Sequence, residues 1–477
     1  MDATLVAGVA RADITPPYGI AHANWGAQTH ERAADVDHPL YATALALGDP
    51  EPAVIVDLDL LYLPPDDAAR IRTTVADYAD VPASHVRLSS THTHSGPTLS
   101  RETWADAGSD MIEPYVSTLE HQIAGAAWQA VQQRRPACIA AGTATCEIAV
   151  NRRFRRPDDG TVIVGRNPDG PVDYTVGVLR IDAVDEATER PRTEPLATVI
   201  HYACHPITVG PDNALVTPDY PGIAKQTIAT ATASMPLFLQ GAAGDIGPIH
   251  GVAQAGITEY ESLGRRLGYA ASQTWWAIDP TGRRDEFVDT LPSGAPLAIY
   301  SPTYDDAANQ PVRVHTRDIA LPLRELPAAD EARRTYERQT VELTGLREQD
   351  ADPATIQAAA AATRQAEIRA GLAERYGDQE NESLELHVTT VGSDIALVAM
   401  PGEPFVEIQQ VVHERSPFPT TWFSGYTNVG TAYLPTADAY SAGGYEVEVT
   451  PFSPEAAAHL IETTLETLTE LKDHAAI

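Results

Sequence analysis

The sequence predicts an α/β fold in which a mixed β-sheet is flanked by helices. Strand-like and helix-like runs alternate from the N-terminus onward, which is the pattern of a sheet with covering helices. Several apolar runs also stop at a proline or glycine and are followed by polar side chains. Active sites of α/β proteins lie at such carboxyl ends of strands, so we expect the functional residues there.

The first elements are a hairpin and a helix. Apolar residues dominate 40–47 and 53–59, on either side of the turn Gly48-Asp49-Pro50, and this arrangement predicts two antiparallel strands. A helix should begin near Pro65, because proline and early acidic residues favour a helix N-terminus.

Longer helices follow. Residues 111–134 and 254–277 have the periodicity of amphipathic helices. Residues 327–377 are rich in Ala, Glu, Gln and Arg and are interrupted around 350–353, which predicts an inserted helical hairpin. Because the pattern runs on into a last helix at about 453–471, we expect one domain over residues 1–477.

The charge balance excludes several classes of partner. The net charge is -33, and of the 33 basic residues only Lys225 and Lys472 are lysines. A spread acidic, lysine-poor surface is expected of a protein that stays soluble in molar salt, so we expect a salt-adapted source. Nucleic acid and anionic membranes are poor partners for such an acidic surface.

The sequence also predicts where the protein is located. No apolar run approaches the ~20 residues of a membrane span, and the N-terminus lacks a basic signal region, so we expect a cytoplasmic protein.

Two histidines follow the apolar run Val86-Arg87-Leu88. His92 and His94 stand two positions apart in THTHSGP, just before a Gly-Pro turn. Strand geometry would place both imidazoles on the same side, which suits a divalent metal, with zinc the first choice. The alternative is a pair of surface histidines that hydrogen-bond a loop.

Two further strand ends favour the metal. His205 lies in YACHP after the apolar run 196–200, and Glu403 lies in PGEP after the run 395–399. A hydrolytic zinc centre needs about three protein ligands and an open position for water. The three strand-end segments together therefore predict a metal hydrolase.

Other polar clusters offer substrate contacts. Arg152 lies in the basic run NRRFRR and can anchor an anionic or oxygen-rich substrate group, or simply pair with acids. Gly244 and Gly247, in GAAGDIGP, can let the backbone approach a substrate and offer N–H donors to an oxyanion. Asp219 can cap a helix or orient a ligand histidine. Among the tyrosines near the C-terminus, Tyr433 before a Leu-Pro turn is the best placed to face a metal.

These motifs together resemble a known family. THTHSGP, NRR, YACHP, TPDYPG, QGAAGDIGP, PGEPF and YLPT…GGYEV are similar to segments of the N-terminal catalytic domain of neutral/alkaline, non-lysosomal ceramidases, over essentially the whole chain. The resemblance implies one Zn²⁺ per chain, held by His92, His205, Glu403 and Tyr433. It also places His94, Arg152 and Tyr445 along the substrate site.

The chain departs from the family pattern in two ways. Family ceramidases carry a serine implicated in catalysis in a GDxSP segment, and here Gly247 stands at that position. A step that depends on its hydroxyl is therefore unavailable. The family's additional C-terminal β-sandwich-like domain and secretion signal are also not expected here.

We therefore expect a zinc-dependent, ceramidase-like hydrolase that cleaves an amide or ester (N-acyl or O-acyl) bond with metal-activated water. His94 or Asp245 would carry the proton, while the Gly244–Gly247 backbone and Tyr445 would position the oxyanion. The expected partner is a small molecule with an acyl group. A polar sugar ester, lactone or N-acyl amine is the alternative substrate. A non-catalytic zinc-containing binding protein is the alternative of another class.

Overall fold

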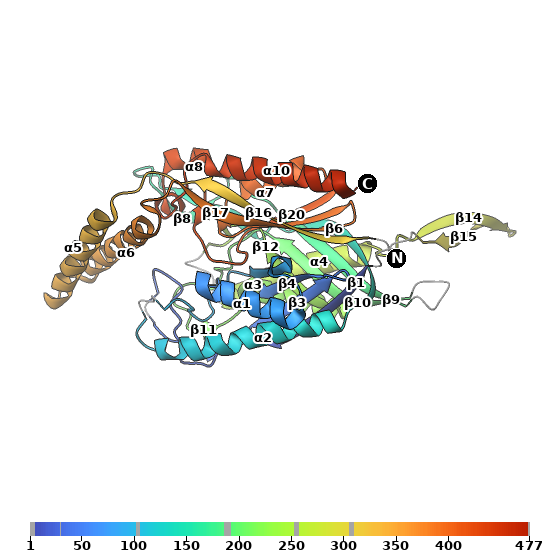
Figure 1. Cartoon of the computed structure of the whole chain (residues 1–477), viewed down its shortest axis with the longest axis horizontal. Coiled ribbons are helices and arrows are strands. Elements are labelled where there is room, and N and C mark those ends of the chain that lie inside the picture. Colours follow the sequence, from blue (N-terminus) through green and yellow to red (C-terminus); the bar gives the residue numbers. More distant parts are fainter. Residues whose placement is uncertain are drawn as a thin grey trace.

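The computed structural model describes residues 5–28, 30–101, 105–185, 192–251, 257–304 and 310–475. These residues form a mixed α/β fold, as predicted, whose largest element is an eight-stranded sheet (Figure 1). Its strands, in sheet order, are β12 (Met235–Gln240), β10 (Arg192–Tyr202), β9 (Thr175–Asp185), β6 (Arg135–Thr145), β1 (Val6–Asp13), β3 (Tyr41–Leu47), β4 (Ala53–Leu58) and β5 (Val86–Ser90). The predicted hairpin is the antiparallel β3–β4 pair, whereas β4–β5 and β10–β12 are parallel.

The large sheet folds back on itself, so that strands from its two ends come together. The Phe238 N–H on β12 donates to Asp57 Oδ2 on β4 at 3.0 Å. Lys225 Nζ, on α3 (Asp219–Thr232), donates to the carboxylates of Asp57 and Asp59 at 2.8 and 2.7 Å. Because β4 and β12 lie near opposite ends of the strand order, this closure also brings the loop after β5 close to the loop after β10.

A second sheet, which the sequence did not predict, packs on the inner face of the first. Its strands are β16 (Val312–Pro322), β17 (Asn381–Val391), β18 (Ile395–Ala399) and β20 (Thr420–Ser424). Alternate side chains of both sheets share one central core, for example Ile55 and Leu237 from the first and Leu397 and Trp422 from the second. Strands buried on both faces read as continuous apolar runs, so their sequence does not reveal which sheet they join.

Helices cover the outer faces of both sheets. In Figure 1, α1 and α2 line one outer side of the molecule, and α7 and α10 line the other. Helices α3 and α4 cover β9, β10 and β12. The bounds are α1 Pro65–Ala79, α2 Ile112–Gln132, α4 Ile257–Ala277, α7 Val406–Arg415 and α10 Ala456–Ala475. The predicted helices match these elements, although residues 254–256 lie outside the described residues.

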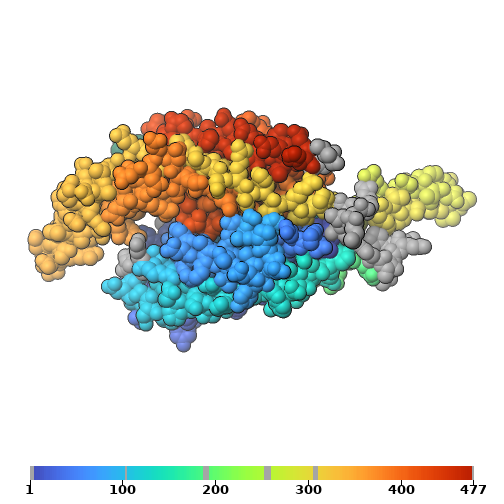
Figure 2. Space-filling model, in the orientation of Figure 1, coloured from blue at the N-terminus to red at the C-terminus, as the bar shows by residue number. Residues whose placement is uncertain are grey.

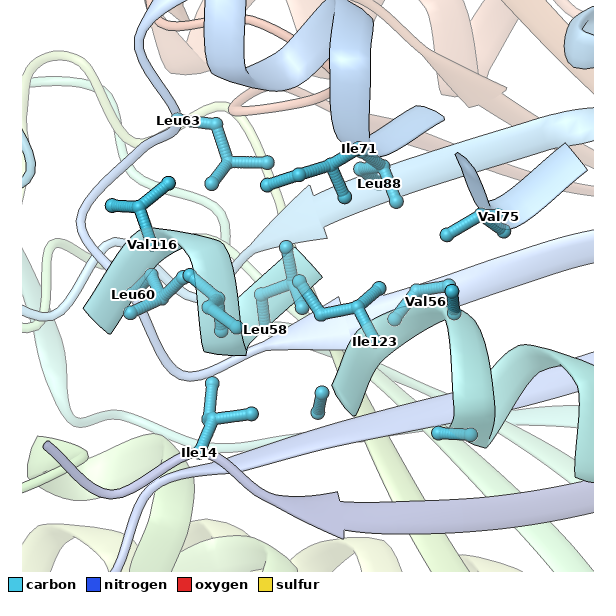
Figure 3. Close-up of a cluster of buried hydrophobic side chains, with 14 of the residues drawn as sticks. Ile14, Val56, Leu58, Leu60, Leu63, Ile71, Val75, Leu88, Val116 and Ile123 are labelled. Carbon is cyan, nitrogen blue, oxygen red and sulfur yellow. The ribbon is translucent and has the colours of Figure 1, made fainter. Parts of the chain in front are cut away.

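The core under α1 and α2 shows why these helices form here. Leu58 and Leu88 from the strands meet Ile71 of α1 and Val116 and Ile123 of α2 (Figure 3). Burial of each such side chain contributes on the order of 1.5–3 kcal/mol. The helices are therefore fixed against the sheet by their apolar faces.

The predicted helical hairpin is present as α5 (Ala329–Glu348) and α6 (Pro353–Tyr376). It extends from one end of the molecule (Figures 1 and 2). The Asp352 carboxylate caps α6 by accepting the Thr355 N–H at 3.0 Å. The hairpin contacts the body through Gln365, whose Nε2 donates to Glu448 Oε2 at 3.1 Å.

Smaller elements complete the described fold. They are β2 (Asp35–Val36), β7 (Ala149–Arg155), β8 (Val162–Asn167), β11 (Leu215–Val216), β13 (Ile246–Pro248), β14 (Arg284–Leu291), β15 (Leu297–Thr303), β19 (Glu403–Pro404), β21 (Tyr433–Leu434), α8 (Ala437–Ala442), α9 (Tyr445–Glu448), η1 (Ala83–His85) and η2 (Ser109–Met111). Among the described residues, none of the helices has the length and apolarity to cross a bilayer.

Candidate metal centre

The loop after β5 carries two of the predicted site residues. β5 ends at Ser90, and His92 then adopts a left-handed backbone conformation with φ +70°. Its N–H donates to Leu60 O at 2.9 Å. The rings of His92 and His94 lie together, with centroids 5.1 Å apart. The left-handed turn at His92 brings the two rings together. The alternation of side chains along a strand, which the sequence suggested, is not the cause, because β5 ends at Ser90.

His205, in the loop after β10, joins this pair. Its ring centroid lies 4.8 Å from that of His92 and 5.8 Å from that of His94. One ligand atom of each of the three histidines lies within 4.8 Å of the others. The group can therefore hold a metal ion.

The hydrogen bonds of the three imidazoles present lone pairs to one point. The Nδ1 atom of each ring lies against a backbone carbonyl. The carbonyls are those of Leu61, Asn24 and Ala243, at 2.9, 3.1 and 2.5 Å from His92, His94 and His205 respectively. Since a carbonyl oxygen only accepts, Nδ1 carries the hydrogen and Nε2 of the neutral ring keeps its lone pair. Among the described residues, the buried Nε2 atoms of His94 and His205 have no hydrogen-bond partner.

Burial favours the neutral form of His94 and His205. It lowers the pKa of His205 to about 3, with a further contribution from the nearby Arg152 guanidinium. Burial, together with the neighbouring His92 and His205, also holds the pKa of His94 well below its usual value. Neutral rings are the form that binds a metal.

Glu403 brings a carboxylate to the same point. Its Oε2 lies 3.5 Å from His92 Nε2 and 3.2 Å from His205 Nε2. This buried oxygen has no hydrogen-bond partner in the part of the chain that the structure describes. Burial acts to raise the pKa of Glu403, but the neighbouring His92 and His205 hold it well below its usual value. A buried carboxylate oxygen close to nitrogen lone pairs is unfavourable unless a cation binds to both. Imidazole nitrogen and carboxylate oxygen are common ligands of Zn²⁺, so these side chains fit a zinc ion.

Tyr433 lies next to Glu403 in the structure. The two residues are register partners in the short parallel β19–β21 pair. The Tyr433 hydroxyl accepts a hydrogen bond from Arg152 Nη2 at 3.1 Å, and its ring stacks 6.4 Å from that of His205. Its hydroxyl is thus held by a charged donor beside the histidine group.

The basic run on β7 is paired with acids at three of its arginines. Glu446 accepts Arg152 Nε at 2.9 Å and Arg153 Nη1 at 2.7 Å, and all three side chains are at least nine-tenths buried. Arg156 pairs with Asp158. The Arg152 and Arg153 guanidinium groups are therefore anchored by Glu446, and Arg152 reaches the site through Tyr433.

The glycine-rich loop contacts the segment that carries Glu403. The Gly244 N–H donates to Pro404 O at 2.8 Å, and a Cβ at Gly244 would lie 2.4 Å from Glu403 O. Only glycine allows this approach. A Cβ at Gly247 would lie 3.5 Å from the Arg152 Cβ, so that position has room for a side chain.

Asp245 is fully engaged within the protein. Its Oδ2 accepts Asn151 Nδ2 at 2.8 Å, and its Oδ1 accepts the Val406 N–H at the start of α7 at 2.9 Å. Burial raises the pKa of Asp245 to about 7. Asp219 is similarly buried, and its Oδ2 accepts the N–H groups of Thr208 and Val209 in the loop after His205.

Tyr445 and two residues that the sequence did not single out complete the surroundings. The Tyr445 ring lies 5.7 Å from that of Tyr433 and is 41% exposed. The Trp25 ring lies 4.9 Å from that of His94, and the Tyr426 ring 4.4 Å from that of His92. Tyr426 stands in the tyrosine-rich segment that the sequence marked, but Trp25 has no local pattern that predicts its place beside His94.

A small cavity adjoins His92 and Glu403. Its volume is about 20 Å³, which admits about one water molecule. Its lining consists of Tyr62, Leu63, Ser90, His92, Gly402, Glu403, Tyr426, Asn428, Val429, Gly430 and Thr431.

The geometry can be compared with known proteins. No protein-family model matches the chain, and no curated protein matches it. The solved structure of neutral ceramidase from Pseudomonas aeruginosa superposes with a TM-score of 0.67 at 17% identity, covering 99% of this chain and 75% of that chain. The chain has a neutral ceramidase-like fold. A solved ceramidase complexed with C2 gives a TM-score of 0.65 at 17% identity, covering 99% of this chain and 76% of that one. The ceramidase-like architecture therefore extends over nearly the whole chain, as the motifs predicted.

Proposed function

We propose that this protein is a zinc-dependent hydrolase of an amide or ester bond. The observation that carries the proposal is the approach of the His92 and His205 Nε2 atoms to a Glu403 oxygen that has no hydrogen-bond partner among the described residues. We assign His92, His205 and Glu403 as ligands, because Glu403 Oε2 lies 3.5 Å from His92 Nε2 and 3.2 Å from His205 Nε2, and Tyr433 as the fourth. A zinc ion at such a site polarises a carbonyl oxygen and lowers the pKa of water.

The proton acceptor in this proposal is His94. Its Nε2 has no hydrogen-bond partner within the described ranges, while its Nδ1 is held by the Asn24 carbonyl. The ring is thus oriented with a free lone pair toward the site, as a general base requires. Trp25 packs against this ring and limits the access of bulk water to it. Asp245 positions Asn151 and the start of α7, because both of its oxygens already accept hydrogen bonds.

Charge on the reacting carbonyl oxygen needs hydrogen-bond donors. We assign this role to Tyr445, which lies beside Tyr433 and is partly exposed. Arg152 supports the same region through the Tyr433 hydroxyl. Gly244 keeps the Glu403 segment in place, since its N–H is used by Pro404.

The substrate is an acyl compound in this proposal. Support for an N-acyl bond comes from the solved neighbours, which are described as ceramidases. A polar ester or lactone is the second candidate, because the buried Thr431 hydroxyl beside Glu403 has no hydrogen-bond partner among the described residues. Gly247 supplies no hydroxyl to either reaction.

A hydrolysis screen tests the proposal. Ceramide, acyl-amino-sugars, sugar esters and lactones should be incubated with the protein at molar salt, and the released acid or alcohol measured. Turnover of at least one class should disappear after chelation and return when zinc is added. Turnover that survives in His205→Ala would contradict the proposal. A protein that binds one zinc but hydrolyses none of these compounds would favour the zinc-containing binding protein instead.

A further inference from the structure

The β14–β15 hairpin projects from the body of the protein. It forms a two-stranded sheet of its own, at the end of the molecule opposite α5 and α6 (Figures 1 and 2). All residues of β14 are exposed, as are all but one of β15. We call residues 284–303 the arm.

The arm presents large apolar side chains on both of its faces. Six of them are between 41% and 60% exposed: Phe287, Val288, Leu291, Leu297, Ile299 and Tyr300. Because side chains alternate along a strand, Ile299 and Tyr300 lie on opposite faces. In the whole chain the net charge is -33, yet Asp289 is the one charged residue of segment 288–304.

These features are unfavourable for an arm in water. An isolated two-stranded hairpin is at best marginally stable. No other described strand pairs with either outer edge of the arm, so the backbone groups of these edges are available for pairing. Contact with other protein could bury the apolar side chains of both faces and also supply hydrogen bonds to the backbone groups of the edges. A lipid bilayer would cover the side chains but leave the strand edges without hydrogen bonds.

We infer that the arm is a dimerisation element that packs against a second copy of this chain. A second copy supplies an identical apolar arm and identical free edges, as a two-fold symmetric interface requires. If the partner's arm covers one face and the partner's body covers the other, six apolar side chains on each of two arms would bury on the order of 1,200 Å², the lower end of the range for specific interfaces.

The exposed side of α4 extends this surface. Tyr269 and Trp276 are each 64% exposed. They lie one heptad apart, and hence on one face of the helix. α4 ends at Ala277, shortly before the arm begins at Arg284. These aromatic residues can cover the partner's arm when the two copies are related by a two-fold axis.

Sedimentation velocity of the full chain over a range of concentrations tests the inference. In molar salt, where the Debye length is about 3 Å, the wild type should sediment at twice the 51.2 kDa chain mass. The double variant Leu297→Asp/Ile299→Asp should sediment at the single-chain mass, with an unchanged circular dichroism spectrum. Val341→Asp is the matched control, because Val341 is 72% exposed on α5 at the other end, and it should keep the doubled mass.

Three outcomes would overturn the inference. The wild type could sediment at the single-chain mass at every concentration, or the arm variant could keep the doubled mass. The third outcome is a monomeric wild type that floats with phosphatidylcholine vesicles in a density gradient, while the arm variant does not float. This result would make the arm a lipid-binding element.

Discussion

Oε2 of Glu403 lies 3.2 Å from Nε2 of His205. Glu403 follows a strand of the four-stranded sheet, and His205 follows a strand of the eight-stranded sheet. Their meeting therefore depends on the packing of the two sheets against each other. A cation between these two atoms would join the sheets at the proposed active site.

The two glycines of the GAAGDIGP loop should respond differently to substitution. Gly244→Ala should destabilise the protein by about 1–3 kcal/mol, because the new methyl group meets the Glu403 carbonyl. Gly247→Ala is the matched control and should change stability by less than about 1 kcal/mol, because it has room. Urea unfolding at constant salt measures both. Equal losses in the two variants would contradict the close-approach argument.

Glu446 should be far more important for stability than its neighbour Glu448. Glu446→Ala leaves two buried arginines without their anion, which should lower the free energy of unfolding by about 3–5 kcal/mol. Glu448→Ala removes a partly exposed pair with Arg369, which should cost less than about 1 kcal/mol. Comparable effects in urea unfolding would show that Arg152 and Arg153 do not rely on Glu446.

Asp245 gives a prediction about pH. Its pKa in the folded protein is about 7, above the ordinary aspartate value of 3.8, so folding favours the protonated form. The stability that this provides is complete below pH 3.8 and is lost as the pH rises through about 7. The free energy of unfolding of Asp245→Asn, relative to wild type, should therefore increase over this window. A difference that is independent of pH would mean that Asp245 does not titrate there.

Gly247→Ser should reveal what the missing hydroxyl does. The wild type should cleave long-chain ceramide poorly, because no hydroxyl at this position stabilises the transition state, whereas a more polar acyl compound should be turned over. A Cβ at this position makes only ordinary contacts with Arg152 and Ile207, so the backbone there accepts a side chain. A large gain in kcat for ceramide in Gly247→Ser, with Gly247→Ala as control, would support this reasoning. Efficient ceramide cleavage by the wild type would refute the substrate inference, though not the metal site.

The sequence predicted the local elements better than their arrangement. The β3–β4 hairpin, α1, α2 and the α5–α6 pair followed from periodicity and from Pro and Asp at helix starts. The strand-end motifs also identified His92, His205 and Glu403 as a set. The second sheet was not predicted, because the apolar run of β18 is compatible with either sheet.

The contacts that the site residues make with distant parts of the chain could not be predicted from the sequence either. The Asn24 carbonyl that orients His94 comes from a loop distant in sequence, and no residue pattern encodes such a contact. The sequence also suggested that Arg152 could anchor a substrate, and only the structure places it in the ion pair with Glu446.

Metal analysis of the purified protein is the most direct test of the central claim. Wild type should contain about one equivalent of zinc, and His92→Ala, His205→Ala and Glu403→Ala should each contain almost none, because loss of one of few ligands greatly weakens a site. His94→Ala is the matched control, and it should keep the zinc but lose hydrolysis. Full zinc content in both His92→Ala and His205→Ala would contradict the proposed metal centre.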